Sequence, residues 1–168
     1  SRGLGDVYKR QMLNWIETRT DEELAAAARA LFASAFPDSP EPAGVWAAPG
    51  RVNLIGEHID YAGGASIPFA LEQNTAVAVA PRSDGLIRIA SEFDGSIAHA
   101  ELPLADVRPG HPADWSGYVA GTVWAATAAG TLSCTGLDIT IVSDVPVGSG
   151  LSSSCLLYTS PSPRDRTR

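Results

Sequence analysis

Apolar side chains recur at helical spacing in two separate segments of the chain. In the first, residues 24–35, they return every three or four positions, which predicts an amphipathic helix that Pro37 ends. Thr20 stands just before this segment, and Glu23 follows three residues later. This spacing is that of a capping box, in which each of the two side chains accepts a hydrogen bond from a backbone N–H at the start of the helix.

The second helical segment is expected to run from Trp115 to about Ala129. Asp114 can cap its first turn, and Gly130 can end it by adopting a left-handed conformation. Gly121, inside the segment, would let another element pack closely against the helix. The expected core face consists of Val119, Val123, Ala126 and Thr127.

Shorter apolar stretches predict β-strands. Residues 45–48 predict a strand that leads into a turn at Pro49-Gly50, and a short strand over residues 52–55 follows. A run at residues 137–142 is apolar almost throughout and is expected to be a central strand, because strands covered on both faces lack a polar side. Further strands are expected at residues 67–71, 75–80, 86–91 and 97–102, paired as an antiparallel meander.

Composition indicates one soluble globular domain. The chain has 168 residues, of which 45% are hydrophobic, and no apolar run approaches the roughly 20 residues of a membrane span. Two cysteines, Cys134 and Cys155, are too few for a disulfide framework, so we expect a cytoplasmic protein. Six of the twelve basic residues lie in the two ends, so the body between them is strongly acidic and should repel nucleic acid.

The most unusual polar cluster follows the predicted strand at the Pro49-Gly50 turn. Two carboxylates, an imidazole and a phenol, from Glu57, His58, Asp60 and Tyr61, interrupt an otherwise apolar region. Such a set suits a ligand rich in hydroxyls, because one carboxylate accepts from two OH groups at once. Arg51 adds a cation that suits phosphate oxygens. The alternative interpretation is a surface loop with ordinary solvated charges.

A second motif, residues 144–154, follows the apolar strand. Gly148 and Gly150 free the backbone to curl, and the serines at residues 152–154 then begin a segment that should become a helix. Successive backbone N–H groups and hydroxyls at a helix start make an anion site, which indicates a phosphate cradle. The pattern is not that of a Walker A loop, and the alternative is a flexible Ser/Gly turn.

Both motifs resemble those of a known family. The run GRVNLIGEHIDY at residues 50–61 closely resembles the galactokinase signature, and less closely that of its parent, the GHMP small-molecule kinase superfamily. Ile59 is a departure, since most galactokinases carry Thr there. The second motif resembles the GHMP nucleotide loop P-x-G-x-G-L-S-S-S-A and departs from it at Cys155.

The resemblance implies a fold as well. It covers about residues 15–154 and implies an α+β domain, the N-terminal GHMP-kinase domain of the ribosomal protein S5 domain 2-like type. This domain has a mixed or antiparallel sheet with helices on one side, and the C-terminal part of the kinase is missing. Residues 1–11 and 155–168 read as a non-native leader and tail joined to a domain at residues 12–154, unless they are native disordered tails.

The implied reaction is ATP-dependent phosphorylation of D-galactose to α-D-galactose 1-phosphate, by a monomer that uses Mg²⁺. The resemblance makes Arg51 the catalytic residue, which stabilises charge on the transferred phosphoryl group. It implies a sugar site formed by Glu57, His58, Ile59, Asp60 and Tyr61. It implies a nucleotide site formed by Gly148, Ser149, Gly150, Leu151, Ser152, Ser153 and Ser154, with Trp115 and Arg82 near the adenine and Ser154 also a ligand of Mg²⁺.

In this family a catalytic Asp and a Mg²⁺-binding Glu belong to a segment C-terminal to the serine loop, and no residue of the chain occupies those positions. The chain alone is therefore expected to be inactive. Three alternatives stay open. They are another GHMP sugar kinase such as an N-acetylgalactosamine kinase, a galactokinase-like regulator that binds sugar and ATP, and a fragment that binds neither.

Overall fold

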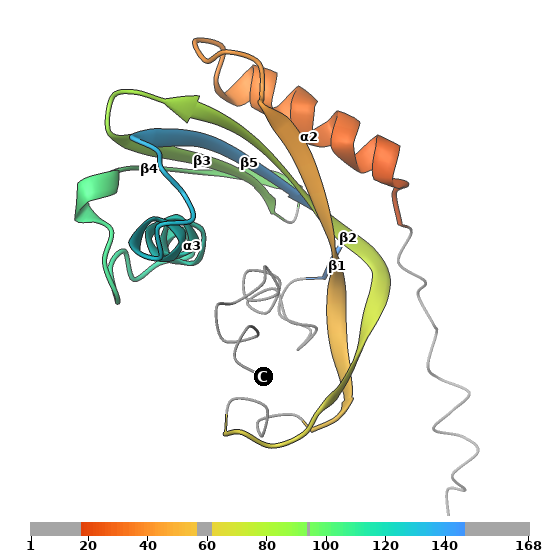
Figure 1. Cartoon of the computed structure of the whole chain (residues 1–168). Coiled ribbons are helices and arrows are strands. Elements are labelled where there is room, and N and C mark those ends of the chain that lie inside the picture. The colour runs from red at the N-terminus through yellow and green to blue at the C-terminus, as the bar shows by residue number, and fades with distance from the viewer. Residues whose placement is uncertain (1–17, 57–61, 94, 147–168) are drawn as a thin grey trace, which may run out of the picture.

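The computed structural model describes residues 18–56, 62–93 and 95–146, which form one mixed sheet with helices packed on it (Figure 1). The strand order is β1-β2-β5-β3-β4. The strands are β1 (Gly44–Ile55), β2 (Ile67–Arg82), β3 (Leu86–Phe93), β4 (Ser96–Pro103) and β5 (Gly136–Ser143). The described helices are α2 (Asp21–Ala35), α3 (Ser116–Ala128) and a 3₁₀ turn η1 (Leu104–Asp106). The expected α+β class is confirmed. None of these helices is long and apolar enough to cross a membrane.

β5 comes last among the described strands and lies at the centre of the sheet. It pairs antiparallel with β2, where Ile141 lies opposite Val77. It pairs parallel with β3, where Ile139 lies opposite Ile89. The expected central strand is therefore confirmed. The expected meander is wrong between β2 and β3, because β5 lies between these two strands. Its last step is confirmed, since β3 and β4 pair antiparallel.

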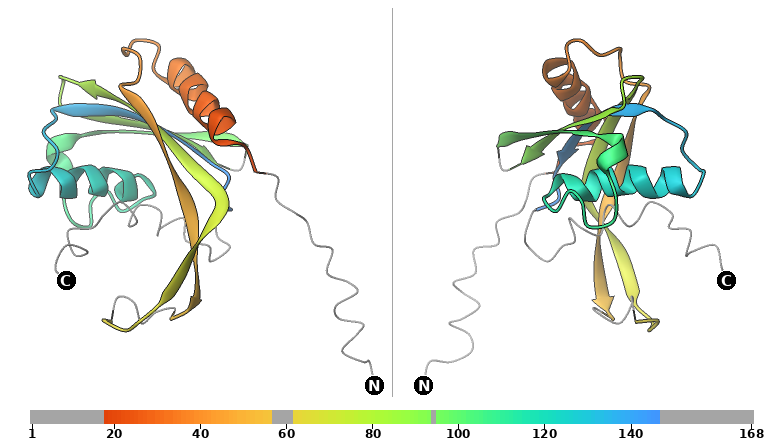
Figure 2. Two further views of the ribbon diagram at one scale, coloured as in Figure 1. Left: turned by 45° about the vertical axis from the view of Figure 1, so that its right-hand side comes forward. Right: turned by 90° about the vertical axis from the view of Figure 1, so that its left-hand side faces the viewer.

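α2 and α3 cover opposite faces of the sheet (Figure 2). Side chains of β2 alternate between the faces: Ala76, Ala78 and Ala80 pack with α2, whereas Val77 and Val79 pack with the cluster that contains α3. The expectation of helices on one side is therefore wrong. β2 and β5 are apolar on both faces, and each apolar face needs a cover. The helices bury Leu24, Ala28, Leu31 and Phe32 from α2, and Val119, Ala120 and Val123 from α3.

The capping box of α2 is confirmed. Thr20 Oγ1 accepts from the Glu23 backbone N–H at 3.2 Å, and Glu23 Oε2 accepts from the Thr20 backbone N–H at 2.8 Å. The hydrogen bond from the Thr20 backbone is the main reason that the pKa of Glu23 lies below its ordinary value. These bonds satisfy two of the backbone donors that the start of a helix leaves free.

The ends of α3 lie close to the expected positions. Asp114 Oδ1 accepts from the Ser116 backbone N–H at 2.8 Å and from the Ser116 hydroxyl at 2.6 Å. Gly130 follows the helix with a φ of +70°, a left-handed conformation that glycine adopts without strain. Thr127 was expected in the core and is instead exposed, with its hydroxyl bonded to the Val123 carbonyl oxygen at 2.9 Å.

The close approach expected at Gly121 occurs one turn earlier, at Gly117. A Cβ at Gly121 would meet no heavy atom within 4 Å. A Cβ at Gly117 would lie 2.2 Å from the carbonyl oxygen of Pro112, in the loop before the helix. The start of α3 therefore packs on this loop only because residue 117 has no side chain.

β1 and β2 are each one long strand, so the turn expected at Pro49-Gly50 is wrong. The register shifts there instead, between Pro49 and Arg51, and Gly50 is buried within the strand. The strands expected at residues 67–71 and 75–80 likewise form one strand. β5 pairs with β2 only from Thr75 onward, so residues 49–55 and 67–74 continue past the sheet as a two-stranded arm (Figure 1). We call these residues the β1–β2 arm.

Candidate functional site

The β1–β2 arm carries the start of the first motif. Arg51, Val52 and Asn53 pair regularly with Ala70, Phe69 and Pro68 of β2, and the register is irregular on both sides of this short piece. Residues two apart in a strand point to the same side. Arg51 and Asn53 therefore share one side of the arm.

Each of these two side chains buries a polar atom that has no hydrogen-bond partner among the described residues. The atoms are Arg51 Nε, a donor, and Asn53 Oδ1, an acceptor. Asn53 is only 9% exposed. A buried polar group without a partner costs about 1–3 kcal/mol, and such groups are rare in folded proteins. The arm thus holds an open donor and an open acceptor side by side, as a polar ligand requires.

Asn53 was not singled out in the sequence, although it stands inside the matching run. An asparagine in a strand is usually exposed, and its burial depends on the tertiary structure. Its place two residues after Arg51, on the same side of a strand, is the signal that could have identified it.

Gly56 ends β1 with a φ of +98°, in the left-handed region that favours glycine. A Cβ there would lie 2.6 Å from the Ala65 carbonyl oxygen. Position 56 therefore requires a glycine, both for its backbone conformation and for the close approach of the chain at Ala65. The predicted sugar-binding residues come next, and all of them lie outside the described residues: Glu57, His58, Ile59, Asp60 and Tyr61.

The chain that leads into the second motif is fixed beside the first. A Cβ at Gly50 would lie 3.1 Å from Val145 Cγ2, so Val145 packs against the irregular point of β1. The Asp144 backbone N–H donates to the Asn74 carbonyl oxygen of the arm at 3.0 Å. Residues 144–146 therefore lie at the base of the arm, next to the residue that precedes Arg51.

Arg19 fixes this junction from the other side. Its Nε and backbone N–H donate to the two carboxylate oxygens of Asp144 at 2.7 Å and 2.8 Å. The hydrogen bond with Asp144 is the main reason that the pKa of Arg19 lies above its ordinary value. The predicted nucleotide loop and metal ligand follow, and all lie outside the described residues: Gly148, Ser149, Gly150, Leu151, Ser152, Ser153 and Ser154.

The structure does not bring together Trp115 and Arg82, the two residues predicted near the adenine. Trp115 stands at the start of α3 and is 38% exposed. Arg82 ends β2, and its Nη1 donates to the buried Asp138 carboxylate at 2.9 Å, while its other nitrogens bond Asp84. Asp138 also bonds Ser39, which follows α2, so Arg82 lies toward the face opposite α3. Their roles at a nucleotide stay predictions.

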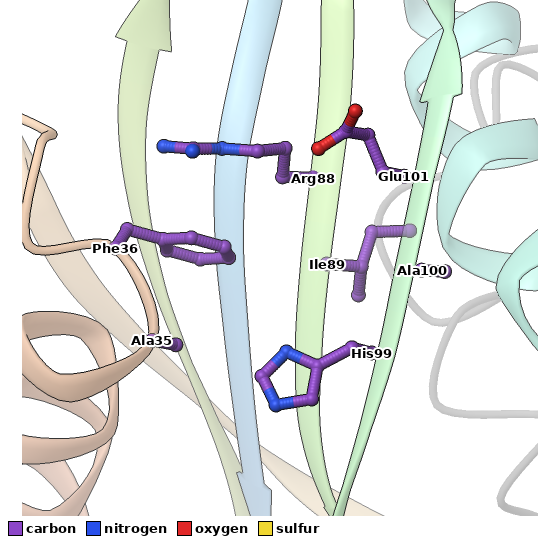
Figure 3. Close-up of a pocket in the computed structure, with 7 residues that line it drawn as sticks. All are labelled: Ala35, Phe36, Arg88, Ile89, His99, Ala100 and Glu101. Atoms are coloured by element: carbon purple, nitrogen blue, oxygen red, sulfur yellow. The ribbon is translucent and has the colours of Figure 1, made fainter.

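A separate hollow of about 250 Å³ lies over β3 and β4 beside the end of α2 (Figure 3). Arg88 lines it, but the guanidinium already bonds Asp138 and Asp38 and lies 4.8 Å from the centroid of the Phe36 ring. The hollow is smaller than the roughly 300–1,000 Å³ of most ligand pockets. It contains none of the predicted site residues. The part of the chain that the structure describes also holds no group of three metal-ligating side chains.

The chain matches a family model described as the galactokinase galactose-binding signature, over residues 30–81. This range contains all of β1 and all of β2 except Arg82. A protein from Streptomyces coelicolor named galactokinase is 50% identical over 117 residues, which are 70% of this chain and 30% of that protein.

Solved structures of two kinases are also similar to this chain. The crystal structure of Lactococcus lactis galactokinase complexed with galactose superposes with a TM-score of 0.66 and 34% identity, over 79% of this chain and 34% of that one. Methanococcus jannaschii mevalonate kinase, at a TM-score of 0.53 and 21% identity over 68% of this chain and 36% of that one, shares the fold. The chain spans about a third of the length of the curated relatives it matches.

Proposed function

Because the chain belongs to the galactokinase family, we propose that it serves the transfer of the terminal phosphoryl group of ATP to the anomeric hydroxyl of D-galactose. The product of this reaction is α-D-galactose 1-phosphate. The observation that carries the proposal is the match of residues 30–81 to a galactose-binding signature. Within those residues, Arg51 and Asn53 bury polar atoms that have no partner among the described residues.

Arg51 stabilises the negative charge that develops on the transferred phosphoryl group. Its Nε is buried and donates to no described residue, and Arg51 takes part in none of the ion pairs found among the described residues, which supports a role at an anionic ligand. A fixed cation in a site with little water stabilises such charge more than a solvated one does. The sugar hydroxyls are held by the cluster that follows Gly56: Glu57, His58, Ile59, Asp60 and Tyr61.

ATP is held by the second motif, Gly148 to Ser154, whose backbone N–H groups and hydroxyls suit phosphate oxygens. The position of Val145 beside Gly50 supports this, because it starts the motif next to the arm that carries Arg51. Mg²⁺ accompanies the nucleotide, with Ser154 as a ligand and phosphate oxygens supplying others. We further propose that Trp115 lies near the adenine and that the protein is a cytoplasmic monomer. Arg82 is not included, because its guanidinium bonds Asp138 and Asp84 toward the face opposite α3.

Isothermal titration of the chain with hexoses tests the sugar half of the proposal. We expect galactose to bind, and glucose, which differs only in the orientation of one hydroxyl, to bind about tenfold more weakly or worse, because a polar site rejects a misplaced hydroxyl. N-acetylgalactosamine is included because it is the substrate of the alternative kinase. A chain that binds neither hexose, binds both equally, or prefers N-acetylgalactosamine contradicts the proposal.

The transfer step needs a separate measurement with ATP labelled at its terminal phosphate. A chain from the same gene that spans the relatives' full length should produce labelled galactose 1-phosphate, whereas the 168-residue chain alone should not. If the longer chain binds galactose and ATP but forms no product, the protein is a sugar-binding regulator and not a kinase.

A further inference from the structure

The described residues contain two buried side-chain polar atoms without a hydrogen-bond partner, and the two belong to neighbouring side chains. Arg51 Nε and Asn53 Oδ1 sit two residues apart on one strand, which places their Cα atoms about 7 Å apart on the same side of the arm. One is a donor and the other is an acceptor. The two side chains can therefore bind a ligand that offers a hydrogen-bond acceptor to Arg51 and a hydrogen-bond donor to Asn53.

The strand opposite cannot satisfy Asn53. Its partner in the register is Pro68, which has no backbone N–H to donate. Ala70, opposite Arg51, has no polar side chain. The register is irregular on both sides of residues 51–53, and such irregularities often aim a side chain into a site.

We propose that Asn53 is a specificity-determining residue for the sugar, and that its Oδ1 accepts a hydrogen bond from a galactose hydroxyl beside the transfer site, at C1 or C2. This inference rests on the proposed function. An acceptor oxygen selects a hydroxyl over a phosphate oxygen, because an ionised phosphate oxygen has no proton to donate. Arg51, the other member of the pair, can donate to the transferred phosphoryl group. In this arrangement Arg51 contacts the phosphoryl group and Asn53 contacts the sugar.

A purely structural role for Asn53 is the competing explanation. Its amide could bond Arg51 or a buried water, and would then stabilise the arm and make no contact with the sugar. The two explanations differ in what an apolar replacement does. Asn53 Oδ1 is buried without a partner, so exchanging this side chain for a leucine of similar size should leave stability unchanged or raise it, whereas breaking a structural bond should lower it.

Galactose titration and thermal unfolding of the Asn53→Leu variant distinguish a sugar-binding role of Asn53 from a structural one. We expect the variant to lose affinity for galactose by about tenfold or more, while its unfolding temperature stays equal to or above that of the wild-type chain. Leu54→Asn is the matched control, because Leu54 is the next residue on the strand and is 73% exposed. This control should bind galactose as the wild-type chain does.

Deoxy sugars add a measurement that a structural role would not change. Of 1-deoxygalactose and 2-deoxygalactose, the one that lacks the bonded hydroxyl should bind the wild-type chain weakly. It should bind Asn53→Leu no more weakly than galactose does, because the shared bond is already gone. If Asn53→Leu does not fold, Asn53→Asp replaces it: the carboxylate keeps the acceptor, so galactose affinity and the deoxy-sugar penalty should both persist.

Three results would overturn the inference. They are wild-type galactose affinity in Asn53→Leu, an equal deoxy-sugar penalty in the variant and the wild-type chain, and loss of the penalty in Asn53→Asp. If the wild-type chain itself binds no galactose, the proposed function fails and this inference fails with it. Binding by the wild-type chain together with any of the three results leaves the proposed function standing.

Discussion

Replacing Asp138 with asparagine should destabilise the sheet strongly, because this one carboxylate joins three parts of the fold. Asp138 lies on β5 and is fully buried. It accepts from Arg88 Nε at 2.7 Å and Nη2 at 2.8 Å, from Arg82 Nη1 at 2.9 Å, and from Ser39 Oγ at 2.6 Å. These bonds connect β5 to β3, to β2 and to the segment after α2.

The size of the effect follows from what the variant leaves behind. In Asp138→Asn, the amide presents N–H donors to guanidinium donors, and two cations lose their buried counter-charge. The side chains of Arg82 and Arg88 are only 15% and 16% exposed, so water replaces little of the loss. Removing one partner of a buried ion pair costs about 3–5 kcal/mol, a large part of the roughly 5–15 kcal/mol that keeps a domain folded. Since urea slopes for small domains are about 1–3 kcal/mol per M, the urea midpoint should fall by about 2 M.

Urea unfolding at pH 7, followed by circular dichroism, measures this shift. Asp84→Asn is the control, since Asp84 pairs with the same Arg82 but its side chain is 42% exposed. The hydrogen bond from Arg82 lowers the pKa of Asp84 to about 2, yet solvent screens the pair, and the control midpoint should hardly move. Equal midpoints for the two variants would refute the reasoning.

The same comparison has a defined dependence on pH. Burial raises the pKa of the Asp138 carboxyl, but the hydrogen bonds from Arg88, Ser39 and Arg82 outweigh it and hold the pKa below its ordinary value. A lowered pKa gives stability that is present above the unfolded pKa of about 3.9 and is lost as the pH falls through the folded value. The gap between the wild-type chain and Asp138→Asn should therefore be constant from about pH 7 to pH 5 and narrow below about pH 4. A gap that does not narrow in acid would show that charge is not its cause.

Two further predictions concern a glycine in α3 and the sugar cluster. Gly117→Ala should lower the free energy of unfolding in urea by about 1–3 kcal/mol, because the new Cβ would collide with the Pro112 carbonyl oxygen. Gly121→Ala adds a Cβ in open space and should raise that free energy by about 0.5–1 kcal/mol. Equal effects of the two variants would contradict the packing described. Asp60→Ala should reduce the preference for galactose over glucose while ATP binding persists, and an unchanged preference in parallel titrations would show that Asp60 is not in the sugar site.

Local features of the fold could be predicted from the sequence. The cap at Thr20 and the end of α3 at Gly130 depend on side chains within a few residues of one another, and both were found. The central position of residues 137–142 was also found, because an apolar run without a polar side indicates a strand covered on both faces. The alternation of alanine and valine from Ala76 to Val79 also carried the signal for two covered faces. It was missed because both residue types are apolar and do not produce a polar face.

Non-local features could not be predicted. The pair of Arg82 with Asp138 joins positions 56 residues apart, and β5 enters between two strands that are consecutive in the chain. The burial of Asn53 depends on how the arm is covered and not on its neighbours in sequence. The chemical character of the two motifs could be identified from the sequence, whereas the unpartnered acceptor Asn53 Oδ1 beside Arg51 could be identified only from the structure.

The central position of β5 has a consequence for how the chain is made. When a ribosome has delivered residues up to Pro103, β2 can pair with β1 and β3 with β4, but the other edge of β2 and of β3 has no partner until residues 136–143 of β5 emerge. Until then two apolar strand edges are available to any other nascent chain, and an exposed edge of this kind is a template for aggregation. Production of this protein should therefore respond to slower translation and to chaperones that bind nascent chains.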